Sequence, residues 1–252
     1  MNLLTRIWQS SLGKKYLMAI TGCALVLFAC GHMVGNLQIF LPPEAINRYA
    51  HFLKSIPELL WIVRLSLLTL VVLHIISAIR LSWENKTARP LDYAGAATPY
   101  AASYASRTML VSGLIIGSFV IYHLLHYTVL VEAVNFTGID FATLKDPKTN
   151  GPDVYAMVVY GFSKWFVSLF YIIAVGLLCL HLSHGIAAMF QSMGWKSPVY
   201  GPVIDKAAKI VAIALFIGYA SIPVAVMCGL GKDHLAQTKM VVQPVAGKEV
   251  AQ

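Results

Sequence analysis

Charged residues are scarce in this chain. Only 12% of its 252 residues are charged, whereas 58% are hydrophobic and the mean hydropathy is +0.70. A soluble domain carries about 25% charged residues, so the composition excludes an ordinary soluble protein. Acidic residues are the scarcest, 11 against 19 Lys and Arg, which gives a formal net charge of +8. In a chain this apolar, that excess predicts cytoplasmic loops and anionic lipid as neighbours rather than nucleic acid.

Cysteine is also rare, and its spacing excludes several kinds of site. The four cysteines, Cys23, Cys30, Cys179 and Cys228, all lie inside apolar segments, and no C-x-x-C pair occurs. A zinc site, a disulfide framework and the C-x-x-C-H attachment of c-type haem are therefore unsupported. The first apolar segment is too long for a signal peptide and has no clear cleavage site, so we expect it to remain as an anchor.

The chain has instead several long apolar runs. Runs of about 18 or more apolar residues predict transmembrane helices. We predict five, over residues of about 16–41, 58–83, 107–131, 163–193 and 205–230. The prediction is an all-α integral membrane protein, a five-transmembrane-helix bundle in one domain (1–231), with a loosely ordered polar tail (232–252). We expect a multi-pass membrane protein with a cytoplasmic N-terminus, because basic residues mark cytoplasmic loops.

The connectors also carry signals. Pro42-Pro43 ends the first run, because proline cannot continue a helix. The stretch that follows it, residues 47–53, predicts a short surface helix. The longest connector, residues 132–162, is acidic overall and has turn signals at Asn150-Gly151-Pro152.

Four of the five runs carry a histidine deep inside: His32, His74, His123 and His181. A histidine at that depth is costly unless it faces the bundle interior and has a partner. Since successive helices alternate in direction, His32 and His123 fall in the outer half of the membrane, and His74 and His181 in the inner half. The two levels differ by roughly 10 Å along the membrane normal, at about 1.5 Å of rise per residue.

Opposed imidazoles from two helices are what bis-histidine haem ligation requires. Each ring must be neutral to ligate, and a low-dielectric site disfavours its protonation. Glycines on these helices offer room for a haem, although glycines in membrane helices also serve helix packing. They are Gly22, Gly31, Gly35, Gly113, Gly117, Gly176 and Gly185.

Further polar residues lie close to the proposed ligands. His126 and His184 each follow a ligand by three residues and share roughly one helix face with it. We expect them to bind haem propionates or to support the ligands, with plain interhelical contact as the alternative. Arg107 and Lys15 begin helices at the inner face and are candidates for propionate pairing, although snorkelling to the interface explains them equally well.

With these residues identified, the chain resembles the dihaem cytochrome b membrane anchor of succinate dehydrogenase and fumarate reductase, of the five-helix b558 family. The similarity covers nearly the whole chain. Its motifs, in order, are S-S-L-G-K-K-Y-L-M-A-I-T-G-C-A-L-V-L-F-A-C-G-H-M-V-G-N-L from Ser10, S-R-T-M-L-V-S-G and F-V-I-Y-H-L-L-H, D-V-Y-A-M-V-V-Y-G-F from Asp153, and L-H-L-S-H-G. One such string is weak evidence, whereas all of them in this order are specific.

The resemblance implies two b haems, with His32 and His123 as axial ligands of the outer haem and His74 and His181 as those of the inner one. It implies a flavoprotein subunit and an iron–sulfur subunit docked on the inner face. Electrons then pass between succinate or fumarate and a membrane quinone, expected to be menaquinone, as part of the respiratory chain and the tricarboxylic acid cycle. The dicarboxylate chemistry lies on a partner subunit, and this chain is the quinone-reactive part of the enzyme. Some relatives carry a glutamate two residues before the last ligand, where this chain has Cys179.

A quinone site is expected near the outer haem, and His51 is the candidate residue. It lies on the predicted connector helix, and an imidazole there can bond a quinone carbonyl and handle its protons. A surface histidine that merely packs the connector is the alternative.

Two other functions remain open on the sequence alone. Histidines spaced H-x-x-H, at 123–126 and 181–184, also suit a membrane di-iron desaturase or hydroxylase, although such enzymes cluster more histidines at one aqueous face. A non-redox membrane subunit, with its histidines as packing groups, is the second alternative.

Overall fold

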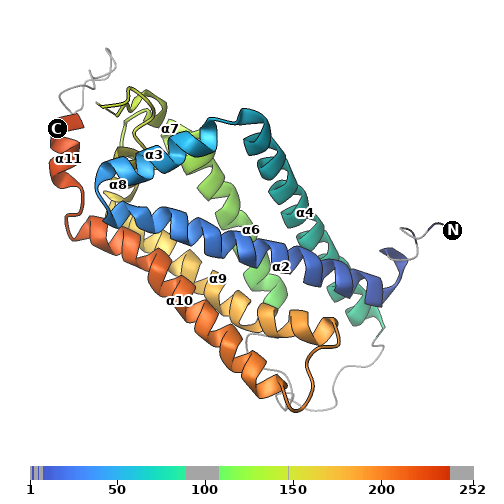
Figure 1. Ribbon diagram of the computed structural model, residues 1–252. Helices are drawn as coiled ribbons and strands as arrows, with labels where there is room; N and C mark the ends of the chain where they lie inside the picture. Colours follow the sequence, from blue (N-terminus) through green and yellow to red (C-terminus); the bar gives the residue numbers. More distant parts are fainter. Residues whose placement is uncertain (1, 3–4, 6–7, 89–107, 147, 239–252) are drawn as a thin grey trace.

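The computed structural model describes residues 2, 5, 8–88, 108–146 and 148–238. Within this part of the chain, five helical segments are long and apolar enough to cross a membrane. They are Ser11–Phe40, Pro57–Thr87, Met109–Val129, Trp165–Ser192 and Gly201–Met227. The long helices lie together as one bundle (Figure 1), which confirms the prediction of an all-α, five-helix membrane protein.

The long helices are α2, α4, α6, α9 and α10. Their bounds are Ser11–Asn36 (α2), Pro57–Thr87 (α4), Met109–Leu124 (α6), Trp165–Ser192 (α9) and Gly201–Met227 (α10). A 3-10 turn, η1 (Leu37–Phe40), extends α2, and a π-helical turn, η2 (Leu125–Val129), extends α6. Helix α9 packs against α2, α6 and α10, while α4 packs against α2 and α6.

Helices α2 and α4 extend past the predicted apolar runs at one end. Helix α2 begins at Ser11 because the Ser10 hydroxyl accepts a hydrogen bond from the Gly13 amide (2.9 Å), a typical N-cap. One turn later Lys14 is only 1% exposed and forms an ion pair with Glu84 of α4 at 3.1 Å. This pair lies beyond the apolar part of both helices, which explains why hydropathy placed their ends inside the true bounds.

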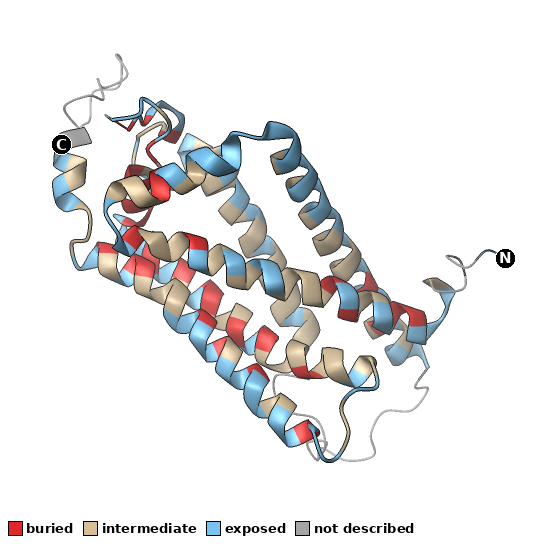
Figure 2. Ribbon diagram, in the orientation of Figure 1, coloured by how far each residue is buried: buried red, intermediate tan, exposed pale blue. Residues whose placement is uncertain are grey.

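Helix α4 is the most exposed of the five. No residue of its most apolar 18-residue window is buried, and most of the helix is coloured exposed or intermediate in Figure 2. Ile62, for example, is 62% exposed. Lipid tails are as apolar as these side chains, so a membrane is the environment that suits this face.

One end of the bundle is covered by short helices, and we call it the capped end (Figure 1). The cover consists of α3 (Pro43–Lys54), α7 (Glu132–Asn135), η3 (Phe141–Thr143), α8 (Val154–Phe162) and α11 (Lys232–Thr238). The opposite end, where α2 begins, is called the open end.

The capped end contains more helix than the sequence predicted. Helix α3 confirms the short connector helix, and the 132–162 connector, for which only turn signals were noted, contains α8. The apolar sequence of α8 buries seven of its nine residues. The start of the tail is also ordered, because α11 packs against α8. Residues 239–252 of the tail lie outside the described residues.

A buried polar network fastens the capped end. The Asn47 side-chain amide of α3 donates to Asp146 and to Asp153, both at 3.1 Å, and its oxygen accepts from the Tyr155 amide at 2.9 Å. Asp153 also lies 2.8 Å from Nε2 of His234, which ties α11 to α8. Burial acts to raise the pKa of Asp146, but hydrogen bonds from the Lys148 amide, Asn47 and Thr149 outweigh it, so that this pKa lies below its usual value.

Candidate functional site

The four intramembrane histidines come from four different helices and form two pairs. His32 of α2 and His123 of α6 lie toward the capped end, with ring centroids 5.9 Å apart and planes at 81°. Two imidazoles that flank one metal ion, each bonded at about 2 Å, have centroids roughly 6 Å apart. The capped-level pair, His32 and His123, therefore has the separation that one shared ion needs.

The second pair, His74 of α4 and His181 of α9, lies nearer the open end. His74 is close enough to His181 to act on it electrostatically. We call them the open-level pair. Depth along the helices predicted both pairs, and the structure places the rings of His32 and His123 side by side.

A threonine hydroxyl holds His74. Oγ1 of Thr21 on α2 lies 3.0 Å from Nδ1 of His74 and donates its own proton to the Leu17 carbonyl at 2.7 Å. The hydroxyl proton is already used, so the oxygen accepts from Nδ1–H of His74. Nε2 of the ring is then left with its lone pair, which is the form that binds a metal ion.

A serine hydroxyl holds His181 in the same way. Oγ of Ser112 on α6 lies 3.2 Å from Nδ1 of His181 and donates to the Met109 carbonyl at 3.2 Å. Hydrogen bonds of this kind orient metal-ligating histidines and fix their tautomer. Both members of the open-level pair are therefore oriented from a neighbouring helix.

A glycine follows each of these hydroxyl residues and makes room for the ring. A Cβ on Gly22 would lie 3.3 Å from Cε1 of His74, and one on Gly113 would lie 3.3 Å from Cε1 of His181. Such contacts are tighter than ordinary packing, so a larger residue displaces the imidazole. We call Thr21-Gly22 and Ser112-Gly113 the two histidine seats.

The two seats occupy equivalent places on their helices. Each begins 11 residues before the histidine of its own helix, from Thr21 to His32 on α2 and from Ser112 to His123 on α6. Eleven residues of helix span about 16 Å. Helices α2 and α6 therefore each carry a ligand for the capped level and a seat for the open level.

The remaining glycines named from the sequence have other neighbours. Gly35 faces the ring of Tyr49, Gly117 faces Ile75, Gly176 faces Phe216, Gly185 faces Met109, and Gly31 has nothing within 4 Å. For the four with neighbours, the contacts are those of helix and connector packing.

His123 lies beside a tyrosine from α9. Oη of Tyr171 is 3.5 Å from Nδ1 of His123 and 3.0 Å from Nδ1 of His126. His126 is completely buried in the π-helical turn, and its ring stacks on Tyr127 at 4.0 Å. Its Nε2 has no hydrogen-bond partner within the described part of the chain.

His32 is held mainly by aromatic rings. Its ring stacks on Phe28 at 5.3 Å and 15°, and Tyr219 of α10 lies 6.2 Å away. The Asn36 side-chain nitrogen is 3.3 Å from both ring nitrogens of His32, but it donates to the His32 carbonyl at 2.7 Å.

The other residues named from the sequence lie at the ends of the bundle. His184 is half-buried near Lys196 and Asp205 at the open end. Lys15 is exposed, whereas its neighbour Lys14 faces inward and is neutralised by Glu84. Arg107 lies outside the described residues. His51 is exposed at the last turn of α3, beside Gly151 of the long connector.

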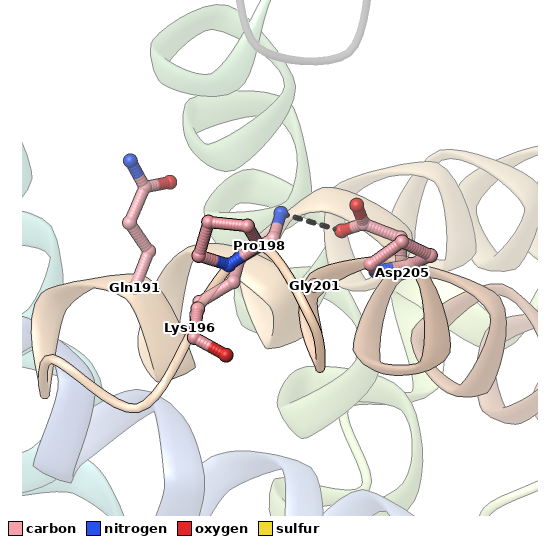
Figure 3. Close-up of a pocket in the computed structure, with 7 residues that line it drawn as sticks. Gln191, Lys196, Pro198, Gly201 and Asp205 are labelled. Atoms are coloured by element: carbon pink, nitrogen blue, oxygen red, sulfur yellow. Dashed lines mark hydrogen bonds and ion pairs between the residues drawn. The ribbon is translucent and has the colours of Figure 1, made fainter.

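A cavity of about 370 Å³ opens at the open end, between the end of α9 and the start of α10 (Figure 3). Its lining includes Lys196 and Asp205, which form an ion pair at 2.6 Å, but none of the four paired histidines. It is a hollow between α9 and α10, separate from the histidine pairs.

The two histidine pairs are the candidate donor set. Across the described ranges, no group of three or more His, Cys, Asp or Glu side chains comes together as a metal site. Haem iron takes two axial ligands from the protein. Each pair supplies that number, and the two seats leave Nε2 of the open-level rings available.

No family model, curated protein or solved structure matches the chain.

Sequence reasoning found the histidines but missed their supports. Thr21, Ser112 and Tyr171 were not singled out, because hydroxyl residues are common in membrane helices. A signal was present, since a hydroxyl residue followed by Gly occurs 11 residues before a histidine in two of the long helices.

Proposed function

We propose that this chain is a membrane-embedded dihaem cytochrome b that carries electrons through two bis-histidine haems and exchanges them with a membrane quinone. In this proposal it anchors the flavoprotein and iron–sulfur subunits of a succinate dehydrogenase or fumarate reductase, in a prokaryotic inner membrane. The observation that carries the haem part is the pairing of four histidines from four helices at two levels. The dicarboxylate partners and the quinone rest on the family resemblance.

Haem b, when bound, supplies reversible one-electron transfer. The chain's part is to present Nε2 of each histidine and to keep it there. Thr21 and Ser112 accept the Nδ1–H bonds of the open-level pair, and Gly22 and Gly113 let those rings lie against their neighbouring helices. Two levels about 16 Å apart along α2 and α6 give electrons two steps across the bundle.

Charge supports an open end that faces the cytoplasm. Near this end the described residues include seven Lys and Arg but only Glu84 and Asp205 as acids. The basic residues are Lys14, Lys15, Arg80, Lys86, Lys196, Lys206 and Lys209. The capped end carries as many described acids as bases, so the positive-inside rule favours a cytoplasmic open end. We propose that the soluble subunits dock there, close to the open-level pair.

The quinone is placed at the capped end, near the capped-level pair. His51 of α3 is exposed there and accessible to a ligand from the membrane interface. An imidazole at that position is able to donate a hydrogen bond to a quinone carbonyl and to transfer its protons.

The test is purification of the tagged chain from its native membranes. The proposal predicts flavin and iron–sulfur subunits in the purified complex and succinate-dependent reduction of menaquinone analogues, lost when the chain is deleted. If the purified complex holds b haems but neither subunit, the proposal of a cytochrome stands and the assignment to this enzyme is wrong.

A further inference from the structure

We propose that Tyr171 is a positioning residue for His123, and that His126 sets the direction of its hydrogen bond. This inference rests on the proposed function, because it requires Nε2 of His123 to bind iron. The three side chains come from two helices: Tyr171 from α9, and His123 and His126 from α6 and its π-helical extension η2.

The direction of the bonds follows from the number of protons. A His123 that ligates through Nε2 carries its proton on Nδ1 and is able only to donate there. Tyr171 Oη, 3.5 Å away, must then accept, and its single proton has to go elsewhere. Nδ1 of His126, at 3.0 Å from the same oxygen, is the acceptor that the structure provides.

Without His126, the Tyr171 hydroxyl would donate its hydrogen bond to Nδ1 of His123. Tyr171 is only 5% exposed and packs among Phe119, Tyr122 and Phe162, so solvent does not offer it an alternative acceptor. Its hydroxyl would then donate to Nδ1 of His123, which requires the tautomer protonated on Nε2 and opposes ligation. His126 removes this competition because its Nδ1 accepts the hydrogen bond from the Tyr171 hydroxyl, which leaves the proton of His126 on Nε2.

Burial and backbone geometry hold His126 at this contact. It is 0% exposed, and the bond to Tyr171 is the hydrogen bond that the structure gives its ring. It lies in the π-helical turn that extends α6, and such turns occur frequently at functional sites. The turn places a second imidazole beside the same hydroxyl that reaches the ligand.

The arrangement completes a reciprocal pattern between α6 and α9. Ser112 of α6 supports His181 of α9 at the open level, and Tyr171 of α9 supports His123 of α6 at the capped level. The difference is that the serine proton goes to its own helix backbone, whereas the tyrosine proton goes to a second histidine.

The test is redox titration of the two haems in the purified complex after Tyr171→Phe, which removes only the hydroxyl. A hydrogen bond from Nδ1–H makes the ligand a stronger donor and favours ferric iron, so its loss raises the capped-level potential. We expect the reduced-to-oxidised ratio at the wild-type midpoint to rise about tenfold, which is about 59 mV for a one-electron couple. The open-level potential stays unchanged. The substitution His126→Phe keeps the ring stacking but removes the acceptor for the Tyr171 hydroxyl, so it changes the potential of the capped-level haem alone.

Tyr122→Phe is the matched control. The ring of Tyr122 lies 5.9 Å from that of Tyr171, and its hydroxyl donates to the Val134 carbonyl at 2.9 Å instead of to an imidazole. Loss of this hydroxyl should leave both haem potentials at their wild-type values. Unchanged potentials in a folded Tyr171→Phe protein with both haems would overturn the positioning role and leave the cytochrome intact. Absence of haem from the wild-type complex would overturn both proposals.

Discussion

The substitution Thr21→Val is the most specific test of the open-level pair. Thr21→Val keeps the branched shape and removes the hydroxyl that is 3.0 Å from Nδ1 of His74. Groups that support a metal-ligating histidine are worth about 10–100-fold in metal affinity. That range corresponds to about 1.4–2.7 kcal/mol, at about 1.4 kcal/mol for each tenfold change. We therefore expect the open-level haem to be retained 10–100-fold less tightly in detergent, with the capped-level haem unaffected.

The assay is haem transfer to an excess of a soluble haem acceptor, followed optically. Thr21→Ser keeps the hydroxyl and should behave as wild type. Thr69→Val is the matched control, because Thr69 is an exposed threonine of α4 whose hydroxyl donates to the Leu65 carbonyl at 2.8 Å without contact with a histidine. Equal haem retention in Thr21→Val and wild type would refute the support of His74 by Thr21. Equal haem losses in Thr21→Val and Thr69→Val would refute it as well.

Three further predictions concern the pairs and the capped end. His123→Ala should remove the capped-level haem and leave the open-level haem ligated, and His181→Ala should do the reverse. Optical spectra of both variants measure this. Loss of both haems from either folded variant contradicts the pairing. The pKa of Asp146 is depressed in the folded state, so the stability it contributes is present above the unfolded pKa of about 4 and is lost as the pH falls through the lower folded value. Hydrogen exchange of α8 should therefore accelerate below about pH 4, and an exchange rate independent of pH after correction for chemistry would contradict this. His51→Ala should lower quinone-dependent turnover at least about tenfold with both haems retained, the size expected for loss of a general acid–base group; unchanged turnover removes His51 from the quinone site.

The long helices were predictable because hydrophobicity is a property of the sequence itself. Runs of apolar residues determine which segments cross the membrane, and the depth of each histidine follows from the count along its helix. The pairing of His32 with His123 therefore needed only alternation of helix direction. The ends of α2 and α4 were not predictable in this way, because the Lys14–Glu84 pair that extends both helices is a contact between distant residues.

The supports of the site and the capped end were harder to predict for the same reason. Whether Ser112 faces lipid or a histidine depends on how α6 is rotated against α9, and hydropathy does not determine that rotation. The order of α11 depends on His234 meeting a buried Asp153, which lies 81 residues earlier in the chain. Such long-range polar contacts are formed by the packed bundle, so the local sequence pattern predicted a loosely ordered tail instead.

The number of haems per chain tests the central claim most directly. The purified chain, without its partner subunits, should give a reduced-minus-oxidised spectrum of b type and a pyridine haemochrome content of two haems per polypeptide. Replacement of all four paired histidines by alanine should abolish the signal in a protein that still inserts in the membrane. A folded wild-type chain that binds no haem when supplied with it would contradict the account.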